Sequence, residues 1–177
     1  MESIKIILLC ILSAVIYGIL HDQITARVCV EYFTIGHPPI FHTDSPTLLG
    51  LGWGVIATWW VGAFLGILAA VAARVGGLPK AAASELIWPL AVLMATAAVA
   101  ALVSGIAGFF AARIFGAWLP ASLVSILPKA KLNAFQADLW AHLASYAVGF
   151  IGGFAICVWL LIGRWRKERV RRNGRNF

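Results

Sequence analysis

Histidine and acidic side chains, which bind metal ions and transfer protons, are concentrated in two short stretches of this sequence. The first covers residues 17–36, YGILHDQITARVCVEYFTIG, and places His21 beside Asp22. The second places Asp138 four residues before His142. On a helix, side chains at this spacing lie about 5–6 Å apart at Cβ, so the pair could bond to each other or bind one metal ion.

The two stretches supply a candidate site for a ligand or a divalent transition metal, formed by His21, Asp22, Glu31, Asp138 and His142. A supporting role is assigned to polar neighbours, namely Gln23, Thr25, Tyr32, Ser145 and Tyr146. The sequence contains no nucleotide-binding loop, no nucleophile elbow and no HExxH motif. No catalytic residue and no definite metal site is therefore assigned.

The same side chains also have a purely structural interpretation. Polar residues are common at the ends of membrane helices because the interface is wet, and an acid at a helix start is favourable against the helix dipole. Three interpretations stay open: a metal site, a site for an ionisable ligand or proton, and a hydrogen-bond network that joins two helices.

The composition indicates that a membrane protein holds these residues. Of its 177 residues, 62% are hydrophobic and 12% are charged, which is more apolar side chain than one soluble core of this size could cover. The net charge is +7, but half of the Lys and Arg residues lie in residues 164–175. This pattern is typical of the flank of a membrane anchor and argues against nucleic acid as a partner.

Four apolar segments predict an all-α bundle of four transmembrane helices. They cover about residues 4–20, 48–73, 86–112 and 139–162, and a helix rises 1.5 Å per residue. We expect a single membrane domain over residues 1–163 and a basic cytoplasmic tail over residues 164–177. The first segment could instead belong to a cleaved signal peptide, but no convincing cleavage site follows it.

Two segments between the spans are expected outside the hydrocarbon. Residues 21–46 contain three prolines, and within them residues 26–35 could form a short strand or an interfacial helix. If this part is helical, Arg27 and Glu31 would form an ion pair one turn apart. Residues 114–137 mix apolar residues with prolines and lysines, which is typical of an interfacial segment. We interpret two loop histidines as solvated, His37 and His42.

Small residues recur at every fourth position of the second span, which predicts close helix packing. They are Gly50, Gly54, Thr58, Gly62, Gly66 and Ala70. The packing glycines assigned from this pattern and from the fourth span are Gly54, Gly62, Gly66, Gly149 and Gly153. Such faces could pack inside the bundle or carry a homo-oligomer or hetero-oligomer.

The distribution of cations predicts the orientation. With the N-terminus inside, ten of the fourteen Lys and Arg residues lie on the cytoplasmic side, as the positive-inside rule requires. Both termini are then cytoplasmic, the basic tail is placed to contact anionic lipid, and all four histidines lie at the outer side.

Three strings of residues resemble a family of small uncharacterised bacterial integral membrane proteins. They are YGxxHDQIT at residues 17–25, EYFT at residues 31–34, and WAHxxSYxxGFxGG at residues 140–153. The resemblance implies a multi-pass protein of the bacterial cytoplasmic (inner) membrane and implies no activity.

Three classes of function remain open. One is a non-enzymatic membrane protein whose outward cluster binds a ligand, ion or partner, or joins helices. Another is a metal-dependent membrane enzyme with His21, His142 and the acids as ligands and Tyr146 or Glu31 in proton transfer. The third is a small transporter or channel subunit. We rank binding or structural roles above catalysis because no catalytic motif is present.

Overall fold

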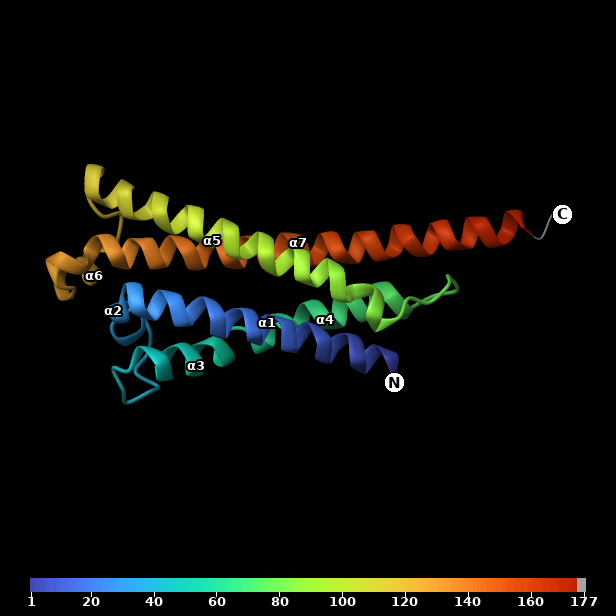
Figure 1. Cartoon of the computed structure of the whole chain (residues 1–177), viewed down its shortest axis with the longest axis horizontal. Coiled ribbons are helices and arrows are strands. Elements are labelled where there is room, and N and C mark those ends of the chain that lie inside the picture. The colour runs from blue at the N-terminus through green and yellow to red at the C-terminus, as the bar shows by residue number, and fades with distance from the viewer. Residues whose placement is uncertain (175–177) are drawn as a thin grey trace.

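The computed structural model describes residues 1–174, and this part of the chain is all-helical. Its elements are α1 (Glu2–Val28), α2 (Val30–Thr34), α3 (Pro46–Ile56), α4 (Trp59–Arg74), η1 (Ala83–Leu86), α5 (Ile87–Phe115), α6 (Ala121–Ile126), η2 (Lys129–Lys131) and α7 (Leu132–Asn173). The long helices lie side by side, and α2 and α6 lie at one end of the bundle, away from both termini (Figure 1). We call this end the loop end, formed by residues 29–45 and 116–131, and the other the terminal end.

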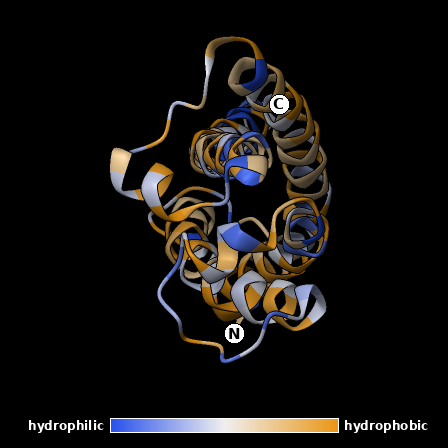
Figure 2. Cartoon of the chain, turned by 90° about the vertical axis from the view of Figure 1, so that its left-hand side faces the viewer, coloured by the Kyte–Doolittle hydropathy of each residue, from blue (hydrophilic) through white to orange (hydrophobic). Residues whose placement is uncertain are grey.

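Four helical segments are long and apolar enough to cross a membrane, which confirms the predicted bundle. They are Glu2–Val28, Pro46–Arg74, Ala83–Phe115 and Lys129–Asn173. Figure 2, which views the bundle end-on, shows mostly hydrophobic ribbon in the bundled helices, and many large apolar side chains on them are exposed. So large an exposed apolar surface is compatible with contact to lipid and is unfavourable in water.

The small-residue face of the second span packs against α1 of the same chain. A Cβ added at Gly54, Gly62 or Gly66 would lie 2.6, 2.7 or 3.0 Å from the nearest α1 atom, so only glycine permits this approach. At Gly153 the nearest atom to such a Cβ is Cδ1 of Leu65, at 2.7 Å, so this glycine faces the end of a side chain and not backbone. Gly149 has no neighbour within 4 Å of such a Cβ, so it is not a packing glycine. Since α1 occupies the stripe, this face is not open to a second copy of the chain.

The second span is broken between α3 and α4, at residues 57 and 58. The Thr58 hydroxyl donates a hydrogen bond to the Gly54 carbonyl, as polar side chains do where a helix bends. The Ala57 carbonyl accepts a bond of 3.4 Å from the hydroxyl of Tyr146 on α7. The break therefore ties the second span to the helix that carries His142.

At the loop end, α1 continues to Val28, well beyond the predicted span. Residues 30–34 form α2, so the helical alternative for this segment is correct. The predicted ion pair between Arg27 and Glu31 is wrong. Cys29 has extended backbone angles (φ −149°, ψ 95°) that turn α2 away from α1. Glu31 pairs instead with Lys131, at 3.2 Å.

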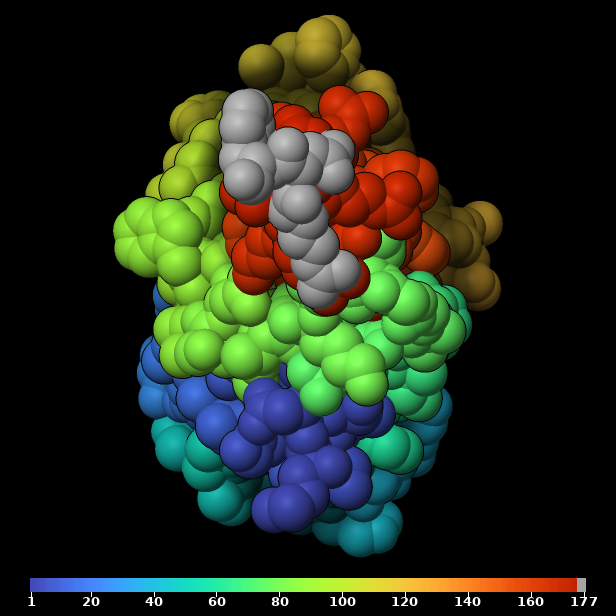
Figure 3. Space-filling model, turned by 90° about the vertical axis from the view of Figure 1, so that its right-hand side faces the viewer, coloured from blue at the N-terminus to red at the C-terminus, as the bar shows by residue number. Residues whose placement is uncertain are grey.

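The terminal end is held by Arg164, the first residue of the predicted basic tail. Its side chain is 1% exposed and donates hydrogen bonds to the carbonyls at the C-terminal end of α4 and in the following loop, those of Ala72, Val75, Leu78 and Pro79. These bonds satisfy acceptors that a helix end leaves free. Figure 3 shows the start of α1, the loop after α4 and the end of α7 meeting here. The predicted tail is helical to Asn173, and residues 175–177 lie outside the described part.

Candidate functional site

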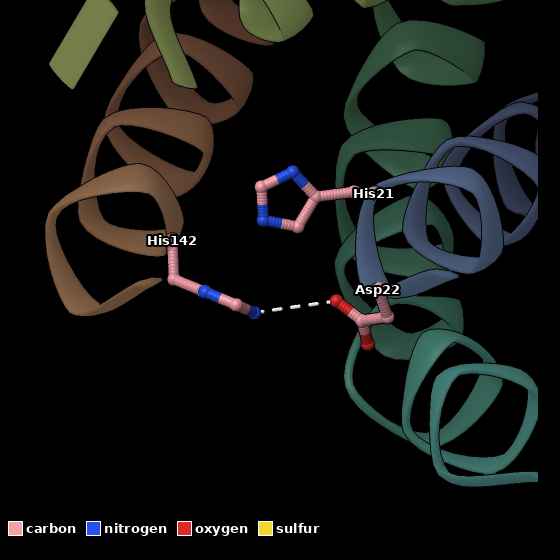
Figure 4. Close-up of side chains that lie close together, drawn as sticks. All are labelled: His21, Asp22 and His142. Atoms are coloured by element: carbon pink, nitrogen blue, oxygen red, sulfur yellow. Dashed lines mark hydrogen bonds and ion pairs between the residues drawn. The ribbon is translucent and has the colours of Figure 1, made fainter. Parts of the chain in front are cut away.

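His21, Asp22 and His142 meet between α1 and α7 near the loop end of the bundle (Figure 4). One potential ligand atom from each lies within 4.8 Å of the other two. Two features bring these side chains together. Gly54, Gly62 and Gly66 let α1 approach α3 and α4 closely, and α1 continues as a helix beyond residue 20, so it includes His21 and Asp22. The sequence analysis predicted one site from residues 17–36 and from the segment that contains Asp138 and His142. The structure brings three of the five candidate residues together.

The ring of His142 is oriented by the main chain of its own helix. Its Nδ1 lies 2.7 Å from the Asp138 carbonyl, and a carbonyl only accepts, so Nδ1 carries a proton and donates. Its Nε2 lies 3.2 Å from Oδ1 of Asp22, and both residues are buried. Nε2 is also protonated and forms an ion pair, or Asp22 carries the proton and donates it to Nε2, or the Nε2 lone pair and the carboxylate face one cation. The third arrangement is the one found around metal-bound histidines.

His21 completes the cluster with a nitrogen that has no partner. Its Nε2 is buried and makes no hydrogen bond within residues 1–174. The ring lies edge-on to that of His142, with centroids 4.5 Å apart, and stacks on Tyr17 at 5.7 Å. Buried polar atoms are nearly always hydrogen-bonded, so an unpartnered imidazole nitrogen beside a carboxylate is a candidate to bind a ligand.

Asp138 and Glu31 are not part of this three-residue group. The predicted pairing of Asp138 with His142 does form, but through the Asp138 main chain and not through its carboxyl group. That carboxyl group is 2% exposed, and its Oδ2 has no partner among the described residues. Glu31 is held away by Lys131. Burial opposes ionisation of Glu31, but hydrogen bonds from the main chain, Lys131 and Cys29 outweigh it and hold its pKa below the ordinary value.

Three of the five predicted supporting residues lie beside the cluster. Tyr32 stacks on the His142 ring with centroids 4.4 Å apart, Ser145 bonds to the Tyr17 hydroxyl at 2.7 Å, and Tyr146 holds the break in the second span. The other two have local partners. Gln23 donates to the Thr47 carbonyl, and Thr25 donates to the His21 carbonyl one turn earlier on α1.

His37 was misinterpreted as a solvated loop residue. Its Nδ1 donates to the Tyr32 carbonyl at 2.8 Å, and its ring packs against Trp53 at 4.5 Å. Burial lowers the pKa of His37 below its ordinary value of 6.5, so the ring is neutral at pH 7. Two of the rings around it, those of Tyr32 and Phe33, lie five and four residues earlier in the chain, but Trp53 comes from α3, and no local pattern could have indicated that contact. His42 is exposed, as expected.

A cavity of about 120 Å³ leads from the cluster into the middle of the bundle. Its walls are mostly apolar, and its polar lining is concentrated beside the cluster, at His21, Asp22, His142, Tyr146 and the Tyr17–Ser145 pair. Gly149 lines it as well, which explains the open space at that glycine. A small ligand in this cavity would contact the cluster.

Two imidazoles and one carboxylate form the donor set of many zinc and non-haem iron sites. The search for similar proteins gave no match to a protein-family model, to a curated protein or to a solved structure.

Proposed function

We propose that this multi-pass membrane protein binds a divalent transition metal ion between His21, Asp22 and His142. The observation that carries the proposal is the orientation of His142. Its Nδ1–H is fixed on a main-chain carbonyl, while its Nε2 faces the Asp22 carboxylate and the unpartnered Nε2 of His21. A second partner on the non-ligating nitrogen is the usual feature of a metal-bound histidine.

The distances agree with a metal site. With metal–ligand bonds of about 2.0–2.1 Å, neighbouring ligand atoms of a tetrahedral ion lie about 3.3 Å apart. His142 Nε2 and Asp22 Oδ1 are 3.2 Å apart, and the third ligand atom is within 4.8 Å of both. Three protein ligands leave one position for water or a ligand, and the cavity adjoins that position.

The alternative is a metal-free ion pair that joins α1 to α7. It accounts for Asp22 and His142, but it leaves the buried Nε2 of His21 without a partner among the described residues. A metal ion would satisfy all three side chains at once.

We also place the cluster at the outer face of a bacterial inner membrane, with both termini in the cytoplasm. The support is the charge distribution, since Lys5, Arg74 and Lys80 lie at the terminal end together with the basic end of α7. A reporter fused after Phe177 should then be cytoplasmic, and a periplasmic signal would reverse this assignment.

The test is the metal content of protein purified in detergent without chelator and then incubated with Zn²⁺ and desalted. We expect about one metal ion per chain, measured by elemental mass spectrometry, and its loss in His142→Ala. His42→Ala is the matched control, because His42 is an exposed histidine outside the cluster, and it should keep the metal. Wild-type protein that retains no metal, or equal retention in all three proteins, would overturn the proposal.

A further inference from the structure

A second hollow reaches the same region from the lipid side. It is a groove of about 750 Å³ between α1 and α5, with part of α7 as its floor. On α1 it extends from Leu9 to Val28, and on α5 from Ile87 to Phe109. At 1.5 Å per residue the α1 side is about 28 Å long, close to the thickness of the hydrocarbon core. The groove therefore spans the depth at which lipid chains lie.

The polarity of the groove is concentrated at its loop end. Nearly all of its wall is apolar, and its polar residues are Ser13, Tyr17, His21, Thr25 and Asp138. The hydroxyl groups of Tyr17 and Thr25 already have partners inside the protein. Oδ2 of Asp138 and Nε2 of His21 have none within the described chain, although both atoms are buried. The apolar groove thus ends at an unsatisfied carboxyl oxygen, that of Asp138, which the proposed metal site does not use.

We propose that this groove binds a membrane lipid with one long apolar chain and a hydroxyl head group, and that the hydroxyl forms a hydrogen bond with the Asp138 carboxyl group. The chain fills the groove, and the head group satisfies a buried carboxyl group that lipid tails cannot satisfy. A packed helix would not do this, because its backbone donors are already used within the helix. His21 lines both the groove and the metal cavity, so the head group of the lipid lies next to the metal cluster.

This inference goes beyond the proposed metal site and does not depend on it. Asp138 is not one of the three proposed ligands, and the groove opens to lipid whether or not a metal ion is bound. The experiment is therefore made on metal-free protein and repeated with His142→Ala. A failure of the metal proposal would leave its result unchanged.

The test is photolabelling in nanodiscs with a long-chain alcohol that carries a diazirine near its hydroxyl group. The matched probe has the same chain and diazirine but a methyl group in place of the hydroxyl. We expect the alcohol to label α1 and α7 near His21 and Asp138, and to label them about tenfold more than the methyl probe, since a methyl group cannot form a hydrogen bond with the Asp138 carboxyl group. Asp138→Leu should remove this preference.

A second pair of variants tests the groove itself, independently of Asp138. Ala98 lines the groove and is exposed on α5, so Ala98→Trp should fill it and abolish labelling. Its neighbour Val99 is exposed outside the groove, and Val99→Trp should label like wild type. Equal labelling by both probes, labelling that persists in Ala98→Trp, or a crosslink between two copies through this groove would overturn the proposal.

Discussion

Replacing Gly54 by alanine tests how the fold positions the site. The new Cβ would lie 2.6 Å from both Cα and N of Ile19, whereas carbon atoms in contact are about 3.5–4.0 Å apart. Because the clash is with backbone, side-chain rotation cannot relieve it, and α1 must move by about 1 Å. The expected cost is about 1–3 kcal/mol of stability.

The same displacement reaches the cluster, because His21 and Asp22 follow Ile19 on α1. A shift of about 1 Å would take the 3.2 Å separation of His142 Nε2 and Asp22 Oδ1 beyond the spacing of two ligands on one ion. Ligand positions must hold to about 0.5 Å, so we expect metal affinity to fall by about tenfold or more.

The assay combines thermal unfolding in detergent with a metal-binding titration. The control is Gly163→Ala, since Gly163 lies inside α7 with open space around it. It should be neutral, or stabilising by up to about 1 kcal/mol, and should bind metal like wild type. If Gly54→Ala matched this control in both measurements, α1 and α3 would not be in backbone contact and our account of the site's assembly would be refuted.

Three further predictions concern residues outside the cluster. Arg164→Met should lower the melting temperature, by the equivalent of about 3 kcal/mol or more, because it leaves several carbonyls without donors, whereas exposed Arg169→Met should have little effect. Cys29 should resist maleimide at pH 7.5 until the protein unfolds, because it is buried and burial raises its pKa to about 12. Mass spectrometry follows the labelling, and rapid labelling of Cys29 in the folded protein would contradict its buried position. The pKa of Glu31 is lowered from 4.5, so ionised Glu31 should stabilise the fold above that pH, and this contribution should be lost as the pH falls through the pKa of Glu31 in the folded protein. Melting curves of Glu31→Gln should lack this part of the acid sensitivity. Identical pH profiles for the variant and the wild type would speak against the pair with Lys131.

The architecture could be predicted from the sequence because the exclusion of apolar side chains from water is evident in the length and composition of the apolar segments. Four long apolar segments must be helices in lipid, and the small residues at every fourth position predicted a close helix contact. The pattern of small residues in the second span did not identify the helix that contacts it. That helix is α1 of the same chain, and a pattern within one segment predicts a packing face but not the segment that packs against it.

The candidate site was predicted in part, for a similar reason. The spacing of Asp138 and His142 placed both on one helix face, but it could not tell that the main chain, not the carboxyl group, would hold the ring. The polar residues after Leu20 were taken as the end of a span, although a helix can continue into the interface without any apolar signal. The angles at Cys29 and the packing of His37 on Trp53 depend on tertiary contacts, which local patterns do not encode.

The most direct test of the metal site is X-ray absorption spectroscopy of the zinc-loaded protein in detergent. We predict two imidazole nitrogens and at least one oxygen at about 2.0–2.1 Å from the metal, with one imidazole lost in His21→Ala. A spectrum without imidazole scattering, or one that His21→Ala and His142→Ala leave unchanged, would show that the metal is bound elsewhere and would contradict the proposed site.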